Sequence, residues 1–396
     1  MSLCASHEFI RDFLPNNNVG LFEVDDVNQP SLFDFCKVTP GYVANIKKIY
    51  GERIKHATYD AQFAYDDKGN PLFINQDDEL INGIYIGIPN KIYHSLPTLS
   101  SSMVKVYKEC PALYRRQYVQ NIQRKRTLTT QRTLDAGTYT HEIVLEPEQF
   151  VNSYYRGIIA AEYPHALSTL DQLKKRAKEL KITKGLSSKE TLVKSISKKA
   201  PEQPLFALIE QEHDQFHERQ NKKKIDPIVF DDAIRCAMTI LTHDDAGPLL
   251  RIEEGLPEVT FIYDCPTTRL KKRTRFDFLR FDNTAVDLKT TRSTESHSFS
   301  KDAVNMGYGI QELMYRESYA VMTRKELDSF IFVTAEYTNL DACETFEIPE
   351  RDHDQLFDVF NETMAELYES LTTDTWNGYS NNQNRKKIQK PHYLSW

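Results

Sequence analysis

The chain has 396 residues, of which 40% are hydrophobic and 27% charged, and its formal net charge is −7. The 21 Tyr and 21 Phe supply apolar area that a disordered chain lacks, so we expect a folded globular protein. No apolar run approaches the roughly 20 residues that cross a bilayer, which argues against a membrane protein.

The N-terminal sequence and the spacing of the cysteines indicate the cellular compartment. The N-terminus lacks a basic stretch followed by an apolar one, so we do not expect secretion. Six cysteines are scattered singly and form no Cys-x-x-Cys pair, which argues against a structural zinc or iron–sulfur site. Because single thiols are typical of a reducing compartment, we expect a cytoplasmic protein.

Charge is unevenly distributed along the chain. Residues 1–88 hold 7 Lys and Arg against 13 Asp and Glu, and we expect them to form a separate acidic N-terminal module of unknown role. Residues 171–200 hold 10 Lys and Arg against 3 Asp and Glu, and Arg124, Lys125 and Arg126 form a second basic group. Such groups suit a polyanion such as DNA, but a charge run is more often a solvated helix face. Charge alone leaves both interpretations open.

The first helices are predicted from their end signals. A serine run at 100–102 predicts the start of a helix near Met103, and Pro111 predicts the start of the next one. A further helix carries His141 and ends at Pro147. Each of these signals is local, so we expect the elements to form where the sequence marks them.

A polar insertion is predicted in the middle of the chain. Residues 151–225 are Lys-rich and irregular, which indicates helical hairpins or an inserted lobe, and a helix near 229–242 follows. We therefore expect one large domain over residues 89–396 with an insertion at about 151–225.

After this helix the sequence pattern changes to segments rich in β-forming residues that are separated by turn signals. This pattern predicts an antiparallel meander. These segments are 258–264, 274–281 and 285–290. A helix at about 302–322 and a buried strand at 329–336 come next, and this spacing predicts a right-handed crossover with parallel pairing. With a last helix at about 351–371, the order α-β-β-β-α-β predicts an α/β fold, a mixed sheet flanked by helices.

Two aspartates and a lysine converge on the predicted meander. Asp287 and Lys289 are two residues apart on one strand, so they point to the same face of the sheet. A three-residue loop at 282–284 places Asp277 opposite Lys289 on that face, whereas a two-residue loop would turn Asp277 to the other face. The two carboxylates offer the oxygen ligands that Mg²⁺ prefers, and a bound cation relieves their repulsion.

Three further roles follow from the residue types. Lys289 is suited to orienting an attacking water or taking its proton. Glu258 is suited to holding a second metal ion, and His141 to completing the shell of the first. Taken alone, each residue has an ordinary structural interpretation, because Asp-x-Lys on a strand is more often an exposed ion pair. Their order within one strand–strand–strand–helix unit favours the metal site.

These residues resemble the core of the PD-(D/E)xK nuclease superfamily. Phe276-Asp277, nine intervening residues and Asp287-Leu288-Lys289 match its motif, with Phe in place of the usual Pro. More narrowly, residues 89–396 resemble the RecE-type exodeoxyribonuclease VIII family of bacteria and their prophages. The segments that carry this resemblance are Tyr93-His94 with LSSSMVK, Gly137-Thr138-x-x-His141, Glu258 with RFDFLR, Tyr308 with Gln311 and Tyr315, and Trp376-x-Gly378-Tyr379.

The resemblance implies an enzyme, a restriction-endonuclease-like fold and a set of roles. It implies a Mg²⁺-dependent exonuclease, with Mn²⁺ as a substitute, that degrades one strand of linear double-stranded DNA from its 5′ end. The remaining 3′ single strand would serve recombination through a single-strand annealing protein, and the enzyme would form a homo-oligomeric ring around DNA.

The resemblance also implies residue roles. The metal ligands would be His141, Asp277, Asp287, the Leu288 carbonyl and Glu258, and Lys289 would be the catalytic lysine. DNA would be contacted by Gln311, Tyr315 and Tyr308, and the basic group Arg124, Lys125 and Arg126 would add charge.

Two alternatives stay open at this point. The same core also serves DNA endonucleases, and a covalently closed plasmid would distinguish them, because an exonuclease spares it. A non-catalytic nucleic-acid-binding or phage structural protein on this fold would cleave no DNA in Mg²⁺.

Overall fold

The computed structural model describes residues 31–122, 128–183, 188–336 and 340–379. The chain divides into two compact units, each described below by itself. The first comprises Met1–Arg126, His243–Glu336 and Ala342–Trp396, and the second comprises Thr127–Thr242 and Tyr337–Asp341. The insertion expected at about 151–225 lies within the second unit, which extends further at both ends.

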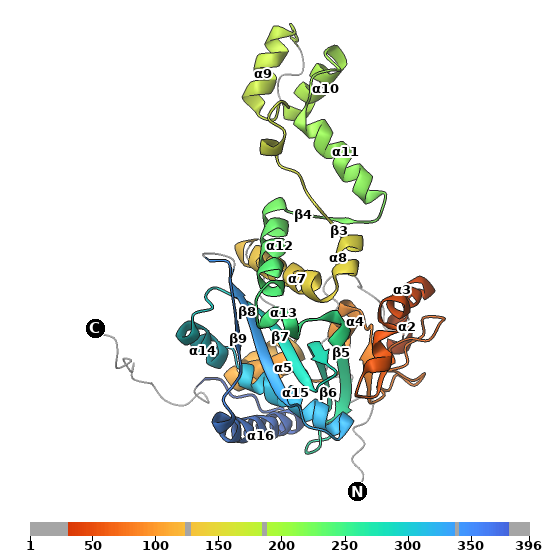
Figure 1. Cartoon of the computed structure of the whole chain (residues 1–396), viewed down its shortest axis with the longest axis vertical. Helices are drawn as coiled ribbons and strands as arrows, with labels where there is room; N and C mark the ends of the chain where they lie inside the picture. The colour runs from red at the N-terminus through yellow and green to blue at the C-terminus, as the bar shows by residue number, and fades with distance from the viewer. Residues whose placement is uncertain (1–30, 123–127, 184–187, 337–339, 380–396) are drawn as a thin grey trace, which may run out of the picture. The chain divides into compact units, whose positions relative to one another are not determined.

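A mixed sheet in the order β1-β2-β5-β6-β7-β8-β9 forms the centre of the first unit (Figure 1). Its strands are β1 Ala61–Phe63, β2 Gly83–Ile86, β5 Gly255–Asp264, β6 Lys271–Arg280, β7 Thr284–Thr291, β8 Ser329–Glu336 and β9 Ala342–Phe346. The meander β5-β6-β7 is antiparallel and β8 pairs with β7 in parallel. The predicted α/β fold, a mixed sheet flanked by helices, is thereby confirmed.

The helices of the first unit follow most of the predicted signals. They include α3 Pro40–Tyr50, α4 Asn90–Ser95, α5 Ser101–Glu109, α6 Pro111–Tyr114, α13 Ala246–Leu249, α14 Ser296–Asn305, α15 Tyr308–Thr323 and α16 Glu350–Thr373. The prediction of a single helix at 302–322 is wrong, because the structure has two helices there. Gly307 takes a left-handed backbone conformation (φ +65°) and separates α14 from α15. None of the described helices has the length and apolar character to cross a membrane.

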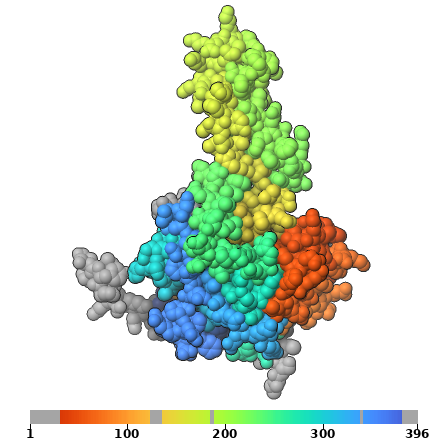
Figure 2. Space-filling model, viewed as in Figure 1, coloured from red at the N-terminus to blue at the C-terminus, as the bar shows by residue number. Residues whose placement is uncertain are grey.

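The described part of the N-terminal segment belongs to the same sheet and core. Strand β2 pairs antiparallel with β5, and β1 adds one more strand at the edge. Tyr59 donates a hydrogen bond to the Leu279 carbonyl (3.1 Å), and Ile84 and Ile86 join the core beneath the sheet. In Figure 2 this segment, in red and orange, packs directly against the rest of the first unit. Residues 31–88 are therefore part of the first unit, in place of the separate acidic module expected.

The second unit is mainly helical. Its elements are α7 Leu128–Leu145, α8 Pro147–Ser153, β3 Tyr154–Arg156, α9 Leu170–Glu179, α10 Lys189–Lys199, α11 Phe206–Glu218, β4 Lys223–Ile225 and α12 Pro227–Leu241. Strands β3 and β4 pair in parallel. In the Lys-rich segment, Leu173, Leu192 and Ile196 form a small buried core, while Lys174 and Lys198 are exposed. The basic residues thus cover the outside of a helical hairpin.

The turn between β6 and β7 sets the register of the site. Residues 281–283 form the predicted three-residue loop, one position earlier than expected, and pairing runs Phe278 with Val286 and Leu279 with Ala285. This register brings Asp277 opposite Asp287. The predicted pairing of Asp277 with Lys289 is therefore wrong. The face is unaffected, because a shift of two residues preserves the alternation of side chains.

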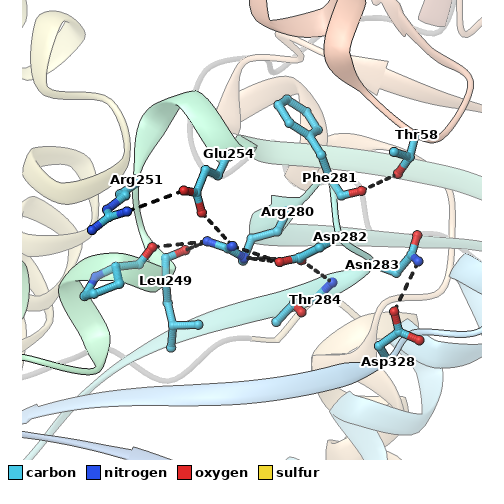
Figure 3. A network of polar contacts seen from close by, with 11 residues as sticks. Thr58, Leu249, Arg251, Glu254, Arg280, Phe281, Asp282, Asn283, Thr284 and Asp328 are labelled. Carbon is cyan, nitrogen blue, oxygen red and sulfur yellow. Dashed lines mark hydrogen bonds and ion pairs between the residues drawn. The ribbon is translucent and has the colours of Figure 1, made fainter.

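A polar network holds this turn (Figure 3). The Arg280 guanidinium donates to Glu254 Oε2 (2.6 Å), to Asp282 Oδ2 (2.8 Å) and to the Leu249 carbonyl (3.2 Å). Asn283 takes the left-handed conformation (φ 63°) that closes a three-residue loop, and its side-chain oxygen accepts from the Tyr319 hydroxyl (2.6 Å). These bonds connect the turn to α13 and α15 and so fix which residues of the two strands face each other.

Candidate active site

Three carboxylates lie at neighbouring positions across the meander. Pro257 pairs with Phe278 and Val259 pairs with Phe276, so Glu258 of β5 lies opposite Asp277 of β6. Continuing the β6–β7 register by one residue places Asp287 of β7 beside Asp277. We call Glu258, Asp277 and Asp287 the carboxylate row. Three like charges at adjacent positions are costly to hold together unless cations offset them.

Glu258 has an unusual backbone conformation. Its φ of +51° lies in the left-handed region, although its neighbours on both sides pair normally with β6. A non-glycine residue in this region costs about 1–2 kcal/mol. Such strain in the middle of a strand is typical of functional sites, where it re-aims a side chain.

Protein groups contact each member of the carboxylate row. Asp287 is 2% exposed and forms an ion pair with Lys289. Asp277 Oδ2 accepts a hydrogen bond from the Leu288 backbone N–H (2.8 Å), which connects β6 to β7 beyond the last paired residues. Arg275 pairs with Glu258 at 3.5 Å. Lys289, Arg275 and the Leu288 N–H thus offset part of the negative charge of the row.

The carboxylates near Lys289 favour the protonated form of its side chain. Burial lowers its pKa, but the charges of Asp287 and then Asp277 outweigh burial and raise the pKa above its usual value. Its ammonium also lies 5.2 Å from the centre of the Tyr308 ring, within range of a cation–π contact. A protonated lysine donates hydrogen bonds and neutralises charge, but it does not take a proton. Both roles predicted for Lys289, orienting an attacking water and taking its proton, stay predictions.

Helix α15 supplies the groups that cover the row. Gln311 is 6% exposed and its Nε2 donates to Asp287 Oδ1 (2.6 Å). Tyr315, 7% exposed, donates its hydroxyl to the Arg275 carbonyl (2.8 Å) and packs edge-on against Phe276. Gln311 therefore reaches the site directly, while Tyr315 packs in the core beside it. Their predicted contacts with DNA, like that of Tyr308, stay predictions.

Two arginines of β6 contribute to the site, although the charge pattern of the sequence did not predict them. Arg273 and Arg275 alternate with Thr274, so they share the face of Asp277. Arg275 is 7% exposed, donates to the Ile88 carbonyl (2.7 Å) and lies 3.9 Å from the centre of the Tyr93 ring. The N-terminal segment thereby holds the arginine that pairs with Glu258. Two arginines spaced by two residues before Asp277 were the available signal.

Lys105 of α5 was also missed. Its Nζ donates to Gln311 Oε1 (3.0 Å) and lies 5.5 Å from the centre of the Tyr308 ring. Burial first, and then the charge of Lys289, lower its pKa to about 8. It stands in the quoted LSSSMVK segment, but nothing in that segment indicates that α5 meets α15.

The donor set suits a hard divalent cation, because carboxylate and carbonyl oxygens are the ligands that Mg²⁺ prefers. Asp277, Asp287 and Glu258 would supply carboxylates and Leu288 a backbone carbonyl. Within the described ranges, no group of three or more His, Cys, Asp or Glu side chains is arranged to hold a metal ion. Each carboxylate contacts a protein group, so a cation bound here would compete with Lys289 and Arg275 for the carboxylate oxygens.

Four of the predicted site residues lie outside the described part of the first unit that forms this site. His141 lies on α7 in the second unit, and its role as a metal ligand stays a prediction. The basic group Arg124, Lys125 and Arg126 lies outside the described residues.

Comparison with known proteins identifies the kind of domain. Residues 100–387 match the family described as a PDDEXK-like domain of unknown function (DUF3799). No curated protein matches the chain. Among solved structures, the chain is similar to that of a "Putative exonuclease" from Eubacterium rectale, with 13% identity, a TM-score of 0.44 and coverage of 77% of this chain and 97% of that chain. It is similar to the structure of SSO0001 with 12% identity, a TM-score of 0.23 and coverage of 61% and 87%. Because both TM-scores are below 0.5, these two structures do not indicate the activity of this chain.

Proposed function

The chain belongs to the family of PDDEXK-like domains of unknown function, and on that premise we propose that it is a metal-dependent nuclease that hydrolyses phosphodiester bonds of DNA. The observation that carries the proposal is the carboxylate row with Lys289 beside it on one face of the meander. Asp277, Asp287 and Lys289 resemble the pattern in the family name, with Phe276 in place of the usual Pro, and this resemblance supports the proposal.

The residues divide the chemical work between them. A bound divalent cation would supply the charge that activates water and stabilises the pentavalent phosphate. Asp277 and Asp287 would hold that cation, with Glu258 available for a second. The protonated Lys289 would donate a hydrogen bond to the attacking water or to a phosphate oxygen, which offsets charge in the transition state. Gln311 keeps Asp287 in place.

We propose further that the protein is an exonuclease that degrades linear double-stranded DNA from the 5′ end. This finer assignment rests on the resemblance to the RecE type, which also predicts Mg²⁺ as the metal, a ring-shaped oligomer and a single-strand annealing protein as partner. Exposed lysines such as Lys174 and Lys198 suit contact with phosphates, so binding should weaken with salt.

One digestion experiment tests the class and the polarity together. Linear duplexes labelled at the 5′ or the 3′ end are incubated with the full chain beside a covalently closed plasmid, in Mg²⁺ or in EDTA. Early release of the 5′ label, an intact plasmid and no reaction in EDTA are expected. Nicking of the plasmid would replace the exonuclease by an endonuclease. No cleavage of any DNA in Mg²⁺ or Mn²⁺ would reject the nuclease proposal.

A further inference from the structure

A second lysine is connected to the carboxylate row through one amide. Lys105 Nζ donates to Gln311 Oε1 (3.0 Å), and Gln311 Nε2 donates to Asp287 Oδ1 (2.6 Å). The other oxygen of Asp287 meets Lys289. Lys105, Gln311 and Asp287 come from α5, α15 and β7, so the order of cation, amide and carboxylate exists only in the folded chain.

We propose that Lys105 is a positioning residue of the active site, which fixes the orientation of the Gln311 amide and through it the Asp287 carboxylate. The inference rests on the proposed function, because it assigns a role in the same site. Lys105 is 206 residues from Gln311 in the chain. Lys105 is not among the proposed metal ligands.

The physical reason is the polarity of the amide. The oxygen and nitrogen ends of a glutamine side chain have nearly the same shape, so packing alone does not choose between them. Here the ammonium of Lys105 faces the oxygen and the carboxylate of Asp287 faces the NH₂. A flipped amide would set donors against the ammonium and an acceptor against the carboxylate. Because Gln311 is 6% exposed, water would not relieve either clash.

The surroundings hold the Lys105 side chain in place. Helix α5 packs on α15, with Val104 and Met314 in the same buried cluster, so the lysine projects from a rigid element. A Cβ at Gly307 would lie 3.1 Å from Lys105 Cγ, so the glycine leaves room for the stem. The Tyr308 ring lies within cation–π range of Lys105 and Lys289.

The cost of this arrangement supports a functional role. Lys105 is half-buried near Lys289, and burial first and then the charge of Lys289 lower its pKa to about 8. A partly buried cation beside a like charge is unfavourable for folding. An apolar side chain would fill the same space more cheaply, so the lysine is better explained by its effect on Gln311.

The test compares Lys105→Met with Lys105→Arg, and uses Lys108→Met as the matched control on the exposed face of α5. In Mg²⁺-dependent cleavage of a linear duplex, Lys105→Met should lower kcat by roughly tenfold with little change in KM, the effect of one charge-assisted hydrogen bond. Lys105→Arg should recover most of the loss, and Lys108→Met should resemble the wild type. In a Gln311→Ala background, Lys105→Met should have no further effect.

An independent measurement keeps the inference separate from the proposed function. In the ¹⁵N-labelled full chain, the Gln311 side-chain NH₂ signals, assigned with Gln311→Ala, should shift in Lys105→Met and not in Lys108→Met. Unchanged signals, an unchanged kcat, or an equal loss of kcat in the Gln311→Ala background would each overturn the inference. If the wild type cleaves no DNA but the signals shift, the nuclease proposal fails and the positioning contact stands.

Discussion

Replacing Lys289 with Met tests whether the ion pair beside the carboxylate row is both buried and functional. Methionine keeps the length of the side chain and removes the charge, so Asp287, 2% exposed, loses its cation and keeps Gln311 as a hydrogen-bond donor. Breaking a buried pair in this way costs about 3–5 kcal/mol. Because the Lys289 side chain is 19% exposed, the lower end, about 3 kcal/mol, is expected in EDTA. The turnover number should fall by about 10²-fold, as for loss of a positioned proton donor.

The assay is denaturation in urea with and without Mg²⁺, beside single-turnover cleavage. Mg²⁺ should restore more stability to Lys289→Met than to the wild type, because the cation no longer competes with an ammonium for Asp287. The double variant Lys289→Met with Asp287→Asn is the control, since it removes the buried charge and should recover most of the lost stability. Wild-type stability of Lys289→Met in EDTA would refute the buried pair, and near-normal cleavage would remove Lys289 from the mechanism.

The remaining predictions concern neighbouring residues. Asp277→Asn is expected to abolish Mg²⁺-dependent cleavage with the fold retained in a melting curve; full activity would discard the metal-site assignment. Glu258→Gly should be about 1 kcal/mol more stable to urea than Glu258→Ala, because glycine adopts φ +51° without a Cβ penalty, and equal stabilities would contradict the strain. Gly307→Ala should lose about 1 kcal/mol or more and lower kcat, since its Cβ would press on Lys105; wild-type melting and activity would argue against this. The pKa of Lys105 is lowered from 10.5 to about 8, so between these values the unfolded chain binds more protons than the folded chain. The free energy of unfolding should therefore rise with pH across that window, by up to about 3 kcal/mol, and urea denaturation of Lys105→Met should show no such rise.

The sequence was sufficient for elements whose signals are local. The buried apolar run at 329–336 coincides with β8 Ser329–Glu336, and Pro111 begins α6. It was also sufficient to place Asp287 and Lys289 on one face, because side chains alternate along a strand, whereas Asp277 joins that face only because the loop before β7 has an odd number of residues, which the structure decided. The metal, the cleavage polarity and the ring are not decided by these local rules, and they stay proposals.

The tertiary structure alone decided which groups meet. The partner of Asp277 depends on the position of the turn, and that position is held by Arg280, whose acceptors include Glu254 and the Leu249 carbonyl, outside the hairpin. Lys105 and Arg275 join the site through elements distant in the chain, α15 and the residues around Ile88. Alternation along a strand is a property of the backbone and can be read from residue order. Register and contacts between distant elements depend on packing and hydrogen bonds that form only when the whole sheet is assembled.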